Sequence, residues 1–209
     1  MKKKRLTRQD WIDAAIKRLI KSGVDAVRVE PLAEEIGVSR GSFYWHFKSR
    51  RELLTAILED WRQHQTRRIV ERIRRDGSLS PIERVVRLRM LPPRTKTTSA
   101  AATFELAIRA WAMRDKFASK IVNEVDSERL AFGTALLADA GMSDEEAGHW
   151  ALMGYAYTLG ESLLRDALSD QQIHESRTRF LMAQARNLDN GVAATGSVIE
   201  ELTDDATTN

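Results

Sequence analysis

Residues 29–54 of this chain combine the signals of two helices joined by a tight turn. They read VEPLAEEIGVSRGSFYWHFKSRRELL, with apolar residues at helical spacing in the first third. Gly37 fits the left-handed position that ends a helix, because it has no Cβ to clash. Ser39 suits the N-cap of a second helix over residues 40–47. The pattern therefore predicts a helix, a turn and a second, short helix.

The second predicted helix has two faces of different chemistry. Phe43 and Phe47 lie four residues apart and are expected to pack inward. The remaining side chains are expected to face outward: Arg40, Ser42, Tyr44, Trp45 and His46. Gly41 leaves the backbone open to close approach by a partner. Aromatic and cationic side chains that share an exposed helix are typical of a surface that binds another molecule. Duplex DNA is such a partner, because phosphates accept from these donors and base edges accept from Arg and Ser.

The motif GVSRGSFYWHFKSRRELL resembles the DNA-binding signature of TetR-type transcriptional repressors. The resemblance covers about the first quarter of the chain and implies an all-α fold. It implies that the outward residues face an operator, with Tyr44 and His46 on phosphates and Arg40 and Ser42 nearest the bases. Three further cations are expected to contact phosphates: Arg28, Lys48 and Arg50.

Charge is distributed unevenly along the chain. Residues 1–75 hold 19 Lys and Arg against 10 Asp and Glu, whereas residues 76–209 hold 14 against 20. A basic N-terminal part and an acidic remainder indicate a polyanion-binding domain followed by a body that does not bind it. A chance split of surface charge is the alternative. Residues 2–5, KKKR, are either an arm that contacts DNA or a solvated terminus.

The composition leaves little room for an enzyme or a metal protein. There are no cysteines, and the four histidines, 46, 64, 149 and 174, are far apart in sequence. We find no nucleophile with a base, no phosphate loop and no ligand spacing, so we expect no catalytic residues, no metal and no cofactor. The longest apolar run, residues 150–160, is too short to cross a bilayer. We expect a soluble, cytoplasmic protein without membrane contact.

Helical periodicity and capping signals predict about nine helices and no sheet. We expect a DNA-binding domain over residues 1–55, a connecting fourth helix over 50–75, a helical ligand-binding and dimerisation domain over 76–190, and a disordered tail over 191–209. The predicted helices after the motif cover about 50–75, 81–91, 100–114, 117–140, 143–164 and 169–188. N-cap pairs such as Ser80 with Glu83 and Ser169 with Gln172 mark several starts.

The predicted eighth helix is apolar on nearly all sides and carries a stripe of small residues. The stripe consists of Ala147, Ala151, Gly154, Thr158 and Ser162. We expect it to let the eighth and ninth helices pack against their copies in a homodimeric four-helix bundle. The family resemblance implies the same arrangement. The alternative is a central helix in a monomer.

Aromatic and thioether side chains in the body are candidates for a pocket that binds a small hydrophobic ligand. The candidates are Phe104, Trp111, His149, Met153, Tyr155 and Tyr157. A buried hydroxyl or imidazole needs a hydrogen-bond partner, which a ligand can supply. Ordinary core packing is the alternative explanation for each of them.

These observations favour a dimeric, ligand-responsive repressor that binds a near-palindromic double-stranded operator. A first rival has the same fold, but its body is only a dimer scaffold or binds a protein. A second rival is an enzyme or carrier for a hydrophobic small molecule.

Overall fold

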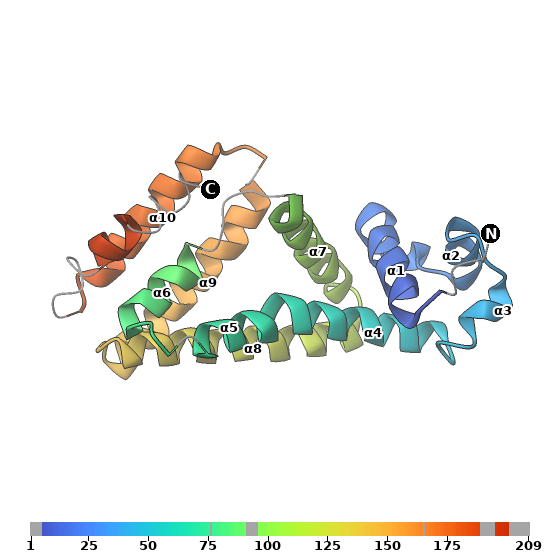
Figure 1. Ribbon diagram of the computed structural model, residues 1–209, viewed down its shortest axis with the longest axis horizontal. Coiled ribbons are helices and arrows are strands. Elements are labelled where there is room, and N and C mark those ends of the chain that lie inside the picture. Colours follow the sequence, from blue (N-terminus) through green and yellow to red (C-terminus); the bar gives the residue numbers. More distant parts are fainter. Residues whose placement is uncertain (1–5, 76, 91–95, 165, 189–194, 201–209) are drawn as a thin grey trace. The chain divides into compact units, whose positions relative to one another are not determined.

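The computed structural model describes residues 6–75, 77–90, 96–164, 166–188 and 195–200, and within these it contains helices and no strand. Figure 1 shows their course. The α-helices are α1 (Arg8–Ser22), α2 (Val29–Glu35), α3 (Arg40–Phe43), α4 (Arg50–Arg62), α5 (Arg68–Arg75), α6 (Pro81–Arg89), α7 (Lys96–Ala112), α8 (Lys116–Asp139), α9 (Asp144–Leu164) and α10 (Asp170–Ala185); η1 (Val24–Ala26) is a 3-10 turn and η2 (Gln63–Arg67) a π turn. The all-α prediction is confirmed.

The expected helix over residues 50–75 is interrupted, which is why ten α-helices appear where about nine were expected. The π turn Gln63–Arg67 separates α4 from α5. A π turn takes an extra residue into one turn and shifts the side-chain register after it. Thr66, inside this turn, is buried with 3% exposure. The sequence between the two helices carries no Gly or Pro, so its composition did not signal the interruption.

Side-chain caps set the starts of most helices as the sequence predicts. Capping boxes are formed by Thr7 with Asp10, Ser80 with Glu83 and Ser169 with Gln172. At α4 the pattern is modified: Ser49 accepts from the Glu52 N–H, while the Glu52 carboxylate accepts from the N–H of Lys48. Each of these bonds satisfies an amide that the first helical turn leaves without a backbone partner.

The chain forms two compact units that differ from the expected domains. One unit comprises Met1–Arg67 and Ala100–Glu124, and the other comprises Arg68–Ser99 and Val125–Asn209. The first unit thus contains the predicted DNA-binding domain and also part of the predicted body. A buried charge explains how α7 joins it: Glu105, 7% exposed, accepts from Trp61 Nε1 of α4 and from Arg109 Nε, both at 2.8 Å.

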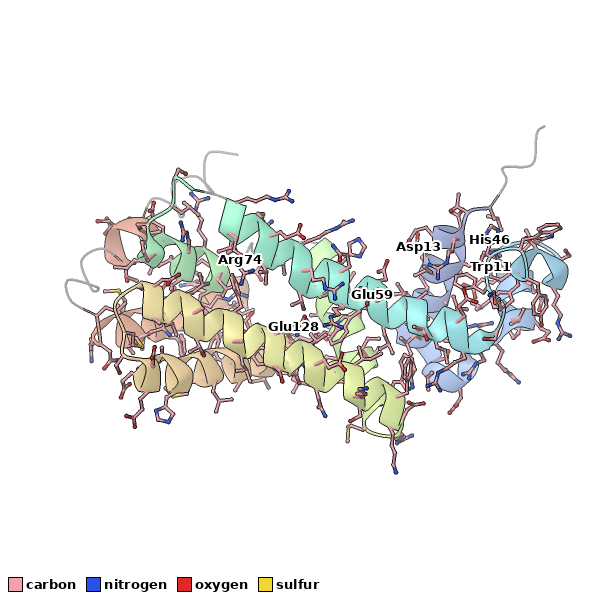
Figure 2. All side chains as sticks on the ribbon, turned by 90° about the horizontal axis from the view of Figure 1, so that it is seen from below. Trp11, Asp13, His46, Glu59, Arg74 and Glu128 are labelled. Carbon is pink, nitrogen blue, oxygen red and sulfur yellow. The ribbon has the colours of Figure 1, made fainter. Side chains whose placement is uncertain are left out.

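The core of the first unit is built on aromatic side chains. Trp11 of α1 and Phe43 of α3 are both fully buried, and their rings meet edge to face at 5.3 Å. Phe47 stacks on Phe43 at 5.4 Å. Figure 2 labels Trp11 of α1 and His46 in the turn after α3. The inward position expected for Phe43 and Phe47 is confirmed, and it fixes α3 on α1.

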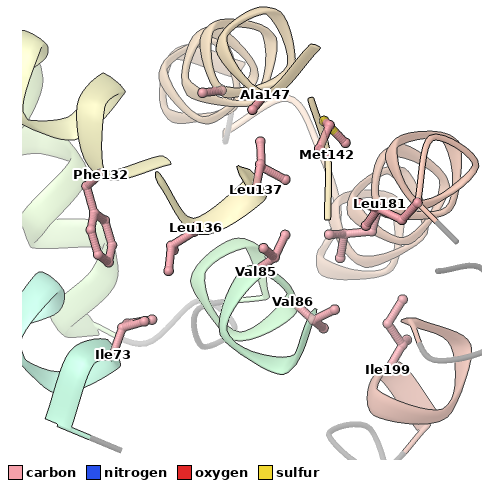
Figure 3. Packing of buried hydrophobic residues seen from close by; sticks show 12 residues of the cluster. Ile73, Val85, Val86, Phe132, Leu136, Leu137, Met142, Ala147, Leu181 and Ile199 are labelled. Carbon is pink, nitrogen blue, oxygen red and sulfur yellow. The ribbon is translucent and has the colours of Figure 1, made fainter. Parts of the chain in front are cut away.

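The second unit has a separate aliphatic core. Val85 and Val86 of α6 lie at its centre and face Leu136 and Leu137 of α8 and Leu181 of α10 (Figure 3). Ile199 also enters this core with 7% exposure, and residues 195–200 are helical. The expected disordered tail over 191–209 is therefore wrong for residues 195–200, because an apolar residue there is covered by the core. Residues 191–194 and 201–209 lie outside the described residues.

Three residues of the small-residue stripe on α9, Ala147, Ala151 and Gly154, are buried against the protein's own side chains. A Cβ on Gly133 of α8 would lie 3.4 Å from the Cβ of Ala151, and a Cβ on Gly154 would overlap the guanidinium of Arg89. Ala147 is fully buried as well. These three residues therefore do not admit a second copy of the chain, because the protein's own side chains cover them, whereas Thr158 is exposed and Ser162 is half-buried.

We predict that Gly37→Ala destabilises the protein by about 1–2 kcal/mol, because Gly37 has a φ of +70°, which L side chains adopt at a cost. Thermal or denaturant unfolding measures this change. Gly41→Ala is the matched control: its φ is not positive, and the nearest atom to an added Cβ is Ser39 Oγ at 3.8 Å. Equal stability of the two variants would contradict the prediction.

Candidate nucleic-acid interface

The turn between α2 and α3 is closed by two backbone hydrogen bonds. The N–H of Val38 donates to the carbonyl of Ala33 at 2.9 Å, and the N–H of Gly37 donates to Glu34 at 3.1 Å. This is the Schellman arrangement, which needs a left-handed residue after the last helical turn. Gly37 supplies that residue, as the sequence predicts. The turn fixes the direction in which α3 leaves α2.

The helix α3 is shorter than expected. It ends at Phe43 instead of Phe47, and residues 44–46 form turns. The N–H of Tyr44 donates to Gly41 at 3.2 Å and that of His46 donates to Phe43 at 2.9 Å, both over three residues. These bonds tighten the chain after a single α-helical turn. Ser39 holds the N-cap position but makes no side-chain cap bond, so its expected capping role is wrong.

The segment from Arg40 to His46 presents two aromatic rings to the outside. Trp45 is 87% exposed and Tyr44 is 52% exposed. Tyr44 also meets the buried ring of Phe43 edge to face at 5.3 Å. Large aromatic side chains are rarely this exposed on a surface that binds only water. The burial of Phe43 therefore holds two neighbouring rings in a position to contact another molecule.

Arg40 is exposed beside these rings and is oriented by two neighbours. Its Nη1 lies 3.1 Å from Glu30 Oε1 of α2, and its Nη2 donates to the Tyr44 hydroxyl at 3.5 Å. The hydrogen bond to Tyr44, followed by the charge of Glu30, raises the pKa of Arg40. The guanidinium thus keeps its charge and is held near the aromatic side chains, where a phosphate or a base edge can accept from it.

The other expected contact residues have mixed positions. Arg28 and Lys48 are exposed, whereas Ser42 and His46 are partly buried on the same segment as Arg40. Gly41 is exposed and its backbone is free of strain, so packing does not require a glycine there. Close approach of a partner to the backbone is a reason for glycine at this position.

Arg50 serves the fold instead of the surface. Its Nε donates to the carbonyl of Val27 at 2.5 Å, and its Nη2 donates to Val24 at 2.6 Å. The guanidinium thereby bonds the Val27 carbonyl and adds a second, charge-assisted hydrogen bond to the Val24 carbonyl, which also accepts from the Val27 N–H. The expectation of a phosphate contact overlooked this alternative, and we leave Arg50 out of the interface.

The expected ligand residues belong to two units of the chain. Phe104 and Trp111 are buried in the first unit, and the other four lie on α9. His149 and Met153 are exposed, so neither side chain is enclosed by the described residues. The Tyr155 hydroxyl donates to Asp126 at 2.6 Å and accepts from Arg129 at 2.9 Å. Its hydrogen-bonding need is met inside the protein.

Tyr157 has a different environment from Tyr155. Its ring stacks on Phe180 of α10 at 5.3 Å. Burial raises the pKa of its hydroxyl, and the charge of Glu161 adds to this. The sequence did not single out Phe180 or Arg89, which also lies beside Phe180, because helical spacing does not show which residues of three different helices meet.

The described part of the chain offers neither a metal site nor a membrane span. Among the described residues, no group of three or more His, Cys, Asp or Glu side chains is placed to hold a metal ion. No helix there is long and apolar enough to cross a membrane.

This geometry is that of a helix-turn-helix domain, in which a short second helix presents its outer face to the major groove. Residues 12–57 match the model of the bacterial regulatory proteins of the tetR family. This segment is therefore a TetR-type helix-turn-helix domain, as the motif predicts.

Two relatives match the same part of the chain. The HTH-type transcriptional regulator SrpR of Pseudomonas putida is 43% identical over 58 residues, 28% of this chain and 27% of that protein. The tetracycline repressor protein class D of Escherichia coli is 40% identical over 53 residues, 25% of this chain and 24% of that protein. The match thus spans about a quarter of these relatives' length.

Solved structures share the fold over most of the chain. A transcriptional regulator from Rhodococcus sp. Rha1 has a TM-score of 0.68 at 15% identity, covering 88% of this chain and 98% of its own. A protein from Saccharomonospora viridis, described as a transcriptional regulator in complex with choline, has a TM-score of 0.68 at 17% identity, covering 83% and 92%. The regulatory protein TetR from Rhodobacter sphaeroides has a TM-score of 0.60 at 20% identity, covering 87% and 98%.

We predict that Arg50→Met lowers the free energy of unfolding by about 1.5–3 kcal/mol, because two carbonyls lose charge-assisted hydrogen bonds. Arg28→Met, which removes an exposed cation from the same unit, is the control and is expected to melt as the unchanged protein does. Denaturant unfolding without DNA measures both. A loss of the same size in the two variants would show that Arg50 has no special structural role.

Proposed function

We propose that this protein is a transcriptional regulator that binds a double-stranded operator as a homodimer and releases it in response to a small ligand. The observation that carries the proposal is the exposed segment Arg40–His46, held by the buried Phe43 and Phe47. The TetR-type domain over residues 12–57 supports the same function. Repression is the mode that we favour, since release from an operator then restores transcription.

Within this interface the side chains divide into two kinds of contact. Arg40 and Ser42 lie on α3 itself and are the candidates for base edges in the major groove. Tyr44, Trp45 and His46 follow in the turn and are candidates for contacts with the phosphate backbone. The exposed cations Arg28 and Lys48 are further candidates for phosphate contacts. Close approach of the backbone at Gly41 fits the tight contact that such a short helix requires.

The apolar surface of α9 supports a homodimer. Leu152, Met153, Leu163 and Leu164 are between 45% and 68% exposed on this single helix. Covering them with the same face of a second copy would remove a large apolar area from water. We therefore propose a dimer through α9 and α10, which correspond to the expected eighth and ninth helices. Its contact surface consists of these exposed apolar side chains and not of the small-residue stripe. A twofold dimer presents two copies of α3 to a near-palindrome.

The ligand response rests on the body of the protein. A ligand that binds one conformation of the dimer more tightly shifts the population toward it and lowers operator affinity by the same coupling free energy. The choline complex of the Saccharomonospora viridis protein supports the idea that this fold accommodates small molecules. We place the ligand in the second unit, where Tyr157 offers a partly covered aromatic surface.

The internal hydrogen bonds of Tyr155 favour a second candidate, in which the body is a dimer scaffold or binds a protein. Asp126 and Arg129 already satisfy that hydroxyl. Operator release by small molecules separates the two functions, since the second candidate predicts none.

We predict that Arg40→Ala lowers affinity for DNA from just upstream of its own gene by about tenfold or more and relaxes base preference, because a good base contact contributes about 1–3 kcal/mol. Tyr44→Phe and His46→Ala are expected to weaken binding to all sequences, and His46→Ala to leave base preference intact. Fluorescence anisotropy at several salt concentrations measures affinity and salt slope.

Gly41→Ala extends this test because the protein without DNA has room for the added Cβ, whose nearest neighbour is Ser39 Oγ at 3.8 Å. We expect unchanged unfolding but weaker operator binding, since the methyl group lies on the surface that approaches DNA. Met113→Ala, at an exposed position outside this segment, is the control. Wild-type affinity in Arg40→Ala, His46→Ala and Gly41→Ala together would overturn the proposed interface.

We predict that Leu163→Asp weakens the dimer by about tenfold or more, because it places a charge in an apolar contact. Sedimentation velocity across a concentration series measures the dissociation constant. Met113→Asp is the matched control, since Met113 is 87% exposed but lies outside α9. Unchanged association of Leu163→Asp would exclude this face as the interface.

A further inference from the structure

Arg89, the last residue of α6, lies where three helices of the second unit meet. Its guanidinium fills the space above Gly154 of α9, where any Cβ would overlap it. Its Cζ lies 5.8 Å from the ring centroid of Phe180 on α10, a cation–π distance. Glycine at 154 thus makes room for a cation on the inner side of α9.

The charge of Arg89 has no ionic partner in the described part of the chain. Two other half-buried arginines of this unit do have polar partners: Arg177 donates to Glu161 through two nitrogens at 2.8 and 2.5 Å, and Arg129 donates to the Tyr155 hydroxyl. Burial lowers the pKa of Arg89 to about 10, so it remains charged at neutral pH. A half-buried cation is energetically unfavourable unless an anion pairs with it and neutralises its charge.

An aromatic surface adjoins this cation. Phe180 meets Trp150 edge to face at 5.7 Å and stacks on Tyr157 at 5.3 Å. All three rings are partly buried, so part of each remains accessible. A cation beside partly accessible rings is complementary to a molecule that carries one negative charge on an apolar frame.

We propose that Arg89 binds the carboxylate of a small, singly charged organic acid, whose apolar part lies on Phe180, Trp150 and Tyr157. One guanidinium neutralises one carboxylate and matches its two oxygens with a pair of N–H donors. A phosphate dianion would leave excess negative charge in this half-buried position. The inference deepens the proposed ligand response by naming the chemical class of the ligand, and it rests on that proposal for its regulatory meaning.

The test measures binding to the full-length protein without DNA. Octanoate and 3-phenylpropionate are the probes, with their uncharged amides and inorganic phosphate for comparison, and thermal stabilisation and titration calorimetry are the readouts. We expect at least one of the two carboxylates to stabilise the protein and the amides and phosphate to have little effect. Arg89→Met is expected to lower carboxylate affinity about tenfold or more, whereas Arg87→Met, an exposed neighbour on α6, retains it.

A second pair of variants keeps the charge and changes its position. Gly154→Ala displaces the guanidinium and is expected to weaken carboxylate binding, while Gly160→Ala on the same helix has open space around the added Cβ and is expected to preserve it. This pair remains informative if Arg89→Met folds poorly.

Several results would overturn the inference: no stabilisation by either carboxylate, equal stabilisation by the amides or phosphate, or unchanged carboxylate affinity in both Arg89→Met and Gly154→Ala. Operator binding is measured separately. If a carboxylate binds through Arg89 but the protein stays bound to DNA, the proposed ligand response is contradicted, whereas the carboxylate site is supported. Loss of all operator binding would contradict the proposed function without affecting the site.

Discussion

The burial of Phe43 and Phe47 against Trp11 is the contact on which the proposed interface depends. A single turn of α-helix has almost no stability of its own. Here two inward rings attach that turn to α1, and the rings of Tyr44 and Trp45 are left outside as a consequence. Trp11, Phe43 and Phe47 thus form the core of the domain, and by fixing α3 they expose Tyr44 and Trp45 on its surface.

Local signals predicted much of this domain because its structure depends on neighbouring residues. The left-handed Gly37, the inward Phe43 and Phe47 and most N-caps follow from spacing and residue type alone. The length of α3 and the position of Arg50 did not, because both depend on hydrogen bonds that compete with the expected ones. Arg50 reaches carbonyls more than twenty residues away in sequence, and the motif does not encode that contact.

The body was harder to predict because its helices are apolar on several sides. Periodicity identified α9 but did not show which face meets its own protein, so the stripe containing Gly154 was assigned to a partner. The structure fills that space with Arg89, a residue that composition gives no reason to notice. Long-range packing also explains why Ile199 joins the core although the composition around it predicts a tail.

Hydrogen–deuterium exchange with and without duplex DNA from the upstream region of its gene tests the central claim most directly. The account predicts that bound DNA slows exchange of amides in residues 37–48, while random competitor DNA at the same concentration protects them less. Unchanged exchange across that segment, with affinity for the fragment intact, would show that the protein binds DNA through another surface and would contradict the account.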